Sequence, residues 1–356
     1  MPEGGTMKFA RITEAERMAK LRIPTGKLRI VIDSDAKNEV DDQFAISWAL
    51  RSPERFNVEA VYAVPFSHAA FQHNIGNAAF PDIEPPDEGM EQSYQEIRKL
   101  YTLLGLDPEG KVLRGADRFL TRGGGPVVSP AVEDLIRRGM EPREDPLYVV
   151  AIGAATNVAS ALMAEPALAD RIVVVWLGGQ PPYFQHGMEF NLAQDILAAQ
   201  CLFDSGVPLV WVPCMNVASL LSLSDDDVRG KLLGKSPIGT YLAEIVLAQF
   251  TNLKKATDRA AGHRRVNLRG RDDQGEDYLS QFPTHHVSWS RTIWDVSTIA
   301  FLKNPGWVQS TLMPAPVLLD DCRWGTPDAA RHAIRVANYC QRDLIFGDMI
   351  ACLTGA

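Results

Sequence analysis

The sequence predicts an α/β protein with an open, mostly parallel β-sheet flanked by helices. Apolar segments of strand length alternate along the chain with segments of helical periodicity. Two strand segments, 147–152 and 171–177, are apolar almost throughout, which is typical of parallel strands covered on both faces. Acidic residues follow the first strand, at the end of the sheet where open α/β folds bind their ligands. A parallel sheet wrapped by helices accounts for all three observations.

The expected elements can be placed along the chain in order. Strands are expected at 28–32, 58–64, 111–114, 147–152, 171–177 and 207–213. Helices are expected at 14–21, 93–104, 132–138, 222–233, 240–250 and 329–339, and also after the acidic turn, after residue 153 and within 292–302. The composition of 76–92 indicates a long loop, and 254–283 is a long polar stretch. We expect residues 1–26 to form an N-terminal extension and 27–356 a single domain.

Charge and cysteine content limit the partners and the compartment. The formal net charge is −8 and no long basic run occurs, which argues against a nucleic-acid or acidic-membrane partner. No apolar run reaches ~18 residues, so we expect no transmembrane helix. The first residues lack an apolar signal segment, and the five cysteines have no CxxC spacing. These features predict a cytoplasmic protein with reduced thiols.

Residues 28–50 (LRIVIDSDAKNEVDDQFAISWAL) contain a dense group of acidic side chains. Five carboxylates lie between the first strand and the helix that follows it: Asp33, Asp35, Glu39, Asp41 and Asp42. Like charges in one small volume either take up protons or bind a cation. Oxygen ligands suit Ca²⁺ or Mg²⁺ better than Zn²⁺, so the turn predicts a hard-metal site. The alternative, which applies best to Asp41 and Asp42, is that acidic residues simply oppose the dipole of the helix.

This stretch resembles the signature of the inosine-uridine-type nucleoside hydrolases, an Asp-x-Asp-x-x-x-Asp-Asp turn after the first strand. Five residues separate Asp35 from Asp41, two more than the usual family spacing, and the usual Pro-Gly is absent. Three further motifs follow in the family's order. They are GAATNVA at 153–159, GMEFN at 187–191, and Asp295 at the start of a helix. The resemblance extends from about residue 28 to residue 350.

The resemblance implies one Ca²⁺ and a set of ligands for it. Asp35 is expected to be a ligand and also the general base that takes a proton from the attacking water. Asp42, Asp295 and the backbone carbonyl of Ile152 are the other implied ligands. Asp33 is expected to orient Asp35 and the turn.

The resemblance also implies contacts to a nucleoside. Asp41, Glu189 and Asn191 are expected to hold the ribose hydroxyls. Glu189 and Asn191 lie on the same side of an extended segment, although the alternative is that they only begin the next helix. Trp294 replaces the family's usual His, as in some purine-preferring members, and offers a flat face for a base, with core filling as the alternative. Asn38, in the enlarged turn, is a candidate for a missing Asn contact to the sugar.

Two more positions differ from the family pattern. His68 follows the second strand, where the family commonly has a sugar-contacting Asn, and it is either a substrate contact or a surface residue. Tyr183 stands where the family usually has an Asn for the 5′ end of the sugar.

Together these features predict a Ca²⁺-dependent nucleoside N-ribohydrolase that releases free base and ribose and favours purines. Such cleavage passes through an oxocarbenium-like sugar and requires an activated water. The expected partner is a small nucleoside or ribosyl compound, and the resemblance implies a homodimer or homotetramer. One alternative is a member that binds nucleosides without turnover. The other is a haloacid-dehalogenase-like phosphohydrolase with Asp33 as nucleophile and Asp35 as acid, although Lys37 stands where that class has Thr or Val.

Overall fold

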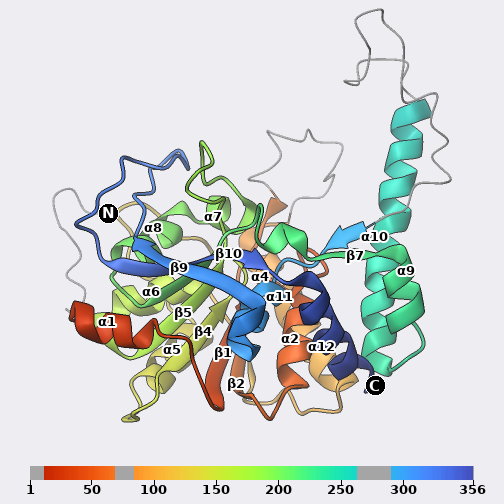
Figure 1. Cartoon of the computed structure of the whole chain (residues 1–356), viewed down its shortest axis with the longest axis horizontal. Coiled ribbons are helices and arrows are strands. Elements are labelled where there is room, and N and C mark those ends of the chain that lie inside the picture. The colour runs from red at the N-terminus through yellow and green to blue at the C-terminus, as the bar shows by residue number, and fades with distance from the viewer. Residues whose placement is uncertain (1–11, 69–83, 263–289, 356) are drawn as a thin grey trace, which may run out of the picture.

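The computed structural model describes residues 12–68, 84–262 and 290–355 (Figure 1). At its centre is an eight-stranded sheet. Across the sheet the strands are β3 (Val112–Arg114), β2 (Phe56–Ala63), β1 (Leu28–Ser34), β4 (Leu147–Ala151), β5 (Ile172–Leu177), β6 (Leu209–Val212), β10 (Ala333–Cys340) and β9 (Val308–Pro314). Neighbouring strands are parallel, except that β10 and β9 are antiparallel. The predicted open, mostly parallel sheet is confirmed.

Helices cover both faces of the sheet because alternate residues of a strand point to opposite sides. On β1, Ile30 and Ile32 face one core, and Val31 faces the other. The first core is closed by α2 (Asp42–Leu50), α4 (Pro86–Leu103), α10 (Pro237–Gly262), α11 (Val296–Lys303) and α12 (Arg342–Thr354). The second is closed by α5 (Pro130–Gly139), α6 (Thr156–Ala164) and α8 (Ile196–Asp204). Every residue of β1 is buried, as expected for a central strand between two helical layers.

The order of the strands places the acidic turn at a special point of the sheet. The chain passes from β1 to β2 on one side, whereas β4, β5 and β6 are added on the other side of β1. Ligands of open α/β sheets bind at the carboxyl ends of the strands where the order reverses in this way. The acidic turn follows β1 and Ile152 follows β4, so both lie at this point.

Residues 329–339 do not form the expected helix. They contribute to β10, which pairs in parallel with β6 and antiparallel with β9. Ile334 and Val336 are buried in the second core, while the Arg335 side chain hydrogen-bonds the carbonyl of Leu21. The helix prediction was wrong because β9 was not predicted and because β6, the other partner of this strand, lies far away in the sequence.

Two other segments also differ from the prediction. Residues 222–224 form β7 (Ser222–Ser224), which pairs with β8 (Ser290–Thr292), and helical structure begins only at α9 (Asp225–Asp227). Ser224 caps this start by accepting a hydrogen bond from the amide of Asp227. Residues 86–92, expected in a loop, belong to α4, which begins with Pro86 at its first position.

Parts of three expected segments cannot be compared with the structure. Residues 1–11, 76–83 and 263–283 lie outside the described residues, whereas 254–262 belong to α10. At the N-terminus, α1 (Glu14–Lys20) docks on the domain, and Arg17 donates from Nε to the carbonyl of Gly206 over 3.0 Å. Within the ranges that are described, no helix is both long and apolar enough to span a membrane.

Candidate active site

Two helices begin at the acidic site. Asp41 immediately precedes α2, Asp295 immediately precedes α11, and these two helices pack against each other. Neither carboxylate accepts a hydrogen bond from the first amides of its own helix. The two side chains are therefore not engaged as helix caps, which weakens the simpler interpretation of acidic residues at a helix start.

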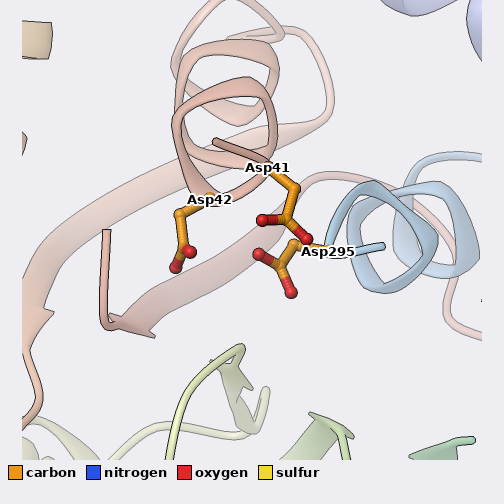
Figure 2. A group of neighbouring side chains, drawn as sticks. All are labelled: Asp41, Asp42 and Asp295. Carbon is orange, nitrogen blue, oxygen red and sulfur yellow. The ribbon is translucent and has the colours of Figure 1, made fainter. Parts of the chain in front are cut away.

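Three carboxylates converge on one small volume. Asp41, Asp42 and Asp295 each place one oxygen so that all three lie within 4.8 Å of one another (Figure 2). Two oxygens that ligate the same Ca²⁺ at ~2.3–2.6 Å cannot be more than roughly 5 Å apart, so this spacing fits a shared ion. The grouping includes Asp41, which the sequence assigned to the substrate. It does not include Asp35, which the sequence assigned to the metal.

The electrostatics of these side chains call for a cation. Burial raises the pKa of Asp42 to about 7, against hydrogen bonds from Ser34 and Asp295 that lower it. Burial, followed by the charges of Asp41, Asp42 and Asp35, raises the pKa of Asp295. Burial and the charges of Asp42 and Asp41 likewise raise the pKa of Asp35. Because the charges of these carboxylates act on one another, Asp35 lies beside Asp41, Asp42 and Asp295. Such a group of carboxylates takes up protons when no cation is bound.

Asp35 has two oxygens in different environments. Its Oδ2 accepts a hydrogen bond from Nδ2 of Asn38 at 2.8 Å, whereas its buried Oδ1 has no partner among the described residues. Gly153 allows this carboxylate to approach the β4 turn, because a Cβ at that position would lie 2.9 Å from Cγ of Asp35. The glycine of the GAATN motif is therefore a steric requirement of the site.

Asp33 is also fully buried and is held by the same motif. Its Oδ1 accepts from Nδ2 of Asn157 at 2.8 Å, while Asn157 Oδ1 accepts from the amide of Ala116. Burial raises the pKa of Asp33 to about 7, and the Asn157 hydrogen bond partly offsets this effect. Asn157 thus joins the end of β1 to the start of α6.

Asn191 connects the ends of two strands. Its Nδ2 donates to the carbonyl of Ile152 at 3.3 Å and to that of Leu177 at 3.1 Å. The Ile152 carbonyl, implied as a metal ligand, therefore faces the Asn191 side chain. The sequence prediction had placed these two groups in separate roles, and the structure brings them into contact.

Glu189 is anchored by backbone amides. Its carboxylate accepts from Gly179 at 2.7 Å, from Asn191 at 3.1 Å and from Leu192 at 3.3 Å, so that it caps α7 (Phe190–Gln194). Glu189 therefore begins a helix, as the alternative expected, and its contact to the sugar stays a prediction. The Cys214 thiol is a further hydrogen-bond partner, and burial raises the pKa of Glu189.

Comparison with known proteins identifies the family. Residues 30–343 match the family of inosine-uridine preferring nucleoside hydrolases. The chain belongs to this family. Its members hydrolyse N-glycosyl bonds, so the phosphohydrolase alternative is set aside.

Individual relatives of this nucleoside hydrolase agree with that assignment. The pyrimidine-specific ribonucleoside hydrolase RihA of Klebsiella pneumoniae is 28% identical over 243 residues, which are 62% of this chain and 70% of the relative. A plant nucleoside hydrolase, PpNRh1, has a TM-score of 0.66 at 18% identity and covers 94% of this chain and 100% of its own. A purine-preferring ribonucleoside hydrolase from Gardnerella vaginalis has a TM-score of 0.64 at 19% identity, with 92% and 98% covered. The solved structures establish the shared fold.

The structure also gives the contacts of three further candidate residues, Trp294, His68 and Tyr183. The backbone amide of Trp294 donates to Asp41 Oδ2 at 3.1 Å, and its half-buried side chain packs against the first core. His68 lies 2.8 Å from a Glu84 oxygen through Nδ1, and its ring contacts Phe190 beside Glu189. Tyr183 is 69% exposed, and its hydroxyl accepts from Asn216.

Sequence reasoning missed four contributors to the site. Ser34 donates to Asp42 Oδ1 at 2.5 Å, Asn157 holds Asp33, and Cys214 contacts Glu189. Arg291 of β8 forms an ion pair with Glu39 and adds a positive charge beside Asp41. Asn157 could have been found from its place in the GAATN motif, but the other contacts join distant segments and leave no local pattern.

Proposed function

We propose that this nucleoside hydrolase is a Ca²⁺-dependent N-ribohydrolase that cleaves ribonucleosides to free base and ribose, with purines favoured. The observation that carries the proposal is the convergence of buried, unneutralised carboxylates at the switch point of the sheet. Family membership supplies the reaction class, and the geometry of the cluster supports a hard cation.

The proposed cation ligands are Asp42, Asp295 and Asp35, with the Ile152 carbonyl as a backbone donor. All are oxygen donors. Asp42 and Asp295 lie together with Asp41 within the span of one ion, and the Asp35 Oδ1 has no other described partner. A bound Ca²⁺ supplies Lewis-acid activation of water at neutral pH. Because Ca²⁺ accepts variable coordination at longer distances than Zn²⁺, this donor set suits it better.

Asp35 is the proposed general base. It is fully buried, and one of its oxygens is held by Asn38 while the other remains available to a water molecule. Burial beside other carboxylates raises the pKa of Asp35. A bound cation would hold the carboxylate ionised, which is the form that can accept a proton from water. Asp33, which accepts a hydrogen bond from Asn157 at the end of β1, is the proposed support for the turn that carries Asp35.

The proposed sugar contacts are Asp41, Glu189 and Asn191. A ribose presents hydroxyls on adjacent carbons, and these need several converging acceptors and donors. Amides fix the Glu189 carboxylate and carbonyls fix the Asn191 amide, so both groups are oriented before substrate binds. Asp41 accepts a hydrogen bond from the Trp294 amide and lies beside Asp42 and Asp295.

Trp294 is the proposed platform for the leaving base. Trp294 precedes Asp295 in the sequence, its backbone amide donates to Asp41, and its side chain is only half-buried. Stacking on an indole favours the larger face of a bicyclic base. This contact is the basis for the proposed purine preference, since the named relatives include both a pyrimidine-specific and a purine-preferring enzyme.

The test is reducing-sugar release from inosine, adenosine, guanosine, uridine and cytidine, with Ca²⁺ and with EDTA. We expect release that requires Ca²⁺ and is fastest for a purine nucleoside, and we expect Trp294→Ala to reduce purine turnover more than pyrimidine turnover. Binding of nucleosides without release of sugar from any of them would favour the non-catalytic alternative, for which the enlarged acidic turn is the structural reason.

We also propose that the protein acts in the cytoplasm as a homo-oligomer, with residues 1–26 as an extension of one domain. All five cysteines are free, as reduced thiols of that compartment would be. Light scattering on the purified chain measures the subunit number, and a monomeric mass would contradict the proposed assembly.

A further inference from the structure

The enlarged acidic turn is closed by contacts within itself. The amides of Lys37 and Asn38 both donate to the carbonyl of Asp35, and Gln43 donates to the carbonyl of Ala36. The chain therefore folds back over Asp35 immediately after it. The residues that lengthen the turn lie next to this carboxylate, so they can act on it.

Asn38 makes the one side-chain contact from these residues to Asp35. Its Nδ2 donates to Asp35 Oδ2 at 2.8 Å, and its own Oδ1 has no partner among the described residues. Asp35 itself is 0% exposed, so this hydrogen bond forms where water cannot easily replace it. Hydrogen bonds to charged groups are stronger than neutral ones, and removing one in a buried place is costly.

We infer that Asn38 is a positioning residue that fixes the rotation of the Asp35 carboxylate. By holding Oδ2, it leaves Oδ1 as the oxygen that faces the cation and the attacking water. This inference rests on the proposed function. It gives a role to the additional turn residues, which the shorter turn usual in the family lacks. The role differs from the expected sugar contact, since the amide of Asn38 is directed at Asp35.

Other side chains of the turn make contacts that do not involve Asp35, so one of them can serve as a control for Asn38. Lys37 is half-exposed, and its Nζ reaches a Glu96 oxygen at 3.4 Å. Glu39 pairs with Arg291 of β8. Neither side chain touches Asp35 in the described structure, so Lys37→Met is a matched control for substitutions at Asn38.

The kinetic arm compares Asn38→Leu and Asn38→Ser with Lys37→Met at saturating Ca²⁺. Leu keeps about the volume of Asn but has no hydrogen-bond donor, and the shorter side chain of Ser does not reach Asp35. Two variants are used so that one remains if the other does not fold. We expect kcat to fall roughly 10- to 100-fold with KM nearly unchanged, since the lost hydrogen bond orients a base and does not bind substrate. We expect Lys37→Met to match the wild type. A rise in KM with unchanged kcat would overturn the inference in favour of a sugar contact.

The second arm does not depend on turnover. Calorimetric titration with Ca²⁺ is carried out on the wild type, Asn38→Leu, Asp35→Asn and the double variant. If Asn38 acts through Asp35, Asn38→Leu weakens Ca²⁺ binding in the wild-type background and has little further effect when Asp35 is already Asn. An equal loss in both backgrounds, or no loss in either, would overturn the inference. Failure of the wild type to hydrolyse any nucleoside would contradict the proposed function and leave this calorimetric cycle to decide the role of Asn38.

Discussion

Both ends of β1 carry buried charged side chains, but those at its start are paired with opposite charges and the carboxylates at its end are not. At its start, Arg29 pairs with Glu59 of β2 at 2.6 Å, and Arg138 also reaches Glu59 at 3.3 Å. At its end, Asp35, Asp41, Asp42 and Asp295 are also buried, but none of these four carboxylates forms an ion pair with a described residue. Glu59 is 7% exposed and Asp35 is 0% exposed, so burial alone does not distinguish the two ends.

The pKa values separate the two ends. Burial by itself would raise the pKa of Glu59, but hydrogen bonds and charge from Arg29 and Arg138 hold it below its usual value. Burial and like charges raise the pKa of Asp35. Paired charges at one end form part of the fold, whereas unneutralised charges at the other end mark a place where a ligand is required. This contrast is the strongest physical argument for locating the site at the carboxyl end of the sheet.

The largest effect is expected from Asp35→Asn. An amide cannot accept the proton of the attacking water, and the loss of general-base catalysis alone is worth ~10²–10⁴ in rate. We expect sugar release to become undetectable or nearly so, with the melting temperature unchanged or higher because a buried charge is removed. Release at the wild-type rate would remove Asp35 from the mechanism.

Arg29→Met is expected to lower the stability of the protein and to leave the catalytic rate unchanged. Removing one partner of a buried ion pair costs about 3–5 kcal/mol of unfolding free energy, because Glu59 is left incompletely neutralised. Chemical denaturation measures this loss, and kcat of the folded enzyme should be unchanged because Arg29 lies at the far end of β1 from the site. A similar fall in kcat without loss of stability would contradict the division between the two ends.

A smaller effect is expected in the pH dependence of stability without divalent cations. Asp33 and Asp42, each with a folded pKa of about 7, bind more protons in the folded than in the unfolded protein between roughly pH 4 and 7. Their contribution to stability is therefore lost as the pH rises through this window. The lowered pKa of Glu59 acts in the other sense, with stability lost as the pH falls below its unfolded value.

Denaturation in EDTA between pH 5 and 7.5 tests this prediction. The unfolding free energy should fall as the pH rises, and added Ca²⁺ should reduce or abolish the fall because it stabilises the ionised carboxylates. Stability that is constant or increases over this range in EDTA would show that the acidic cluster is neutralised by some other group.

Local sequence determined how much of this arrangement could be predicted. The acidic turn, the GAATN motif and Asp295 each lie at the junction of a strand or loop with a helix, so short-range patterns sufficed to locate them. The hydrogen bond of Asn38, the ion pair of Arg291 and the thiol contact of Cys214 depend on side-chain direction or on distant strands. For the same reason β10 was mistaken for a helix, since its identity is set by pairing with β6 and β9.

The most direct test of the central claim is a crystal structure of the protein grown with Ca²⁺. The account predicts one ion per chain at ~2.3–2.6 Å from oxygens of Asp42 and Asp295, with Oδ1 of Asp35 among the ligands. Such a structure would also show whether Asp41 joins the ligands or faces the sugar. An empty acidic cluster at saturating Ca²⁺, or an ion bound elsewhere while these carboxylates remain protonated, would contradict the account.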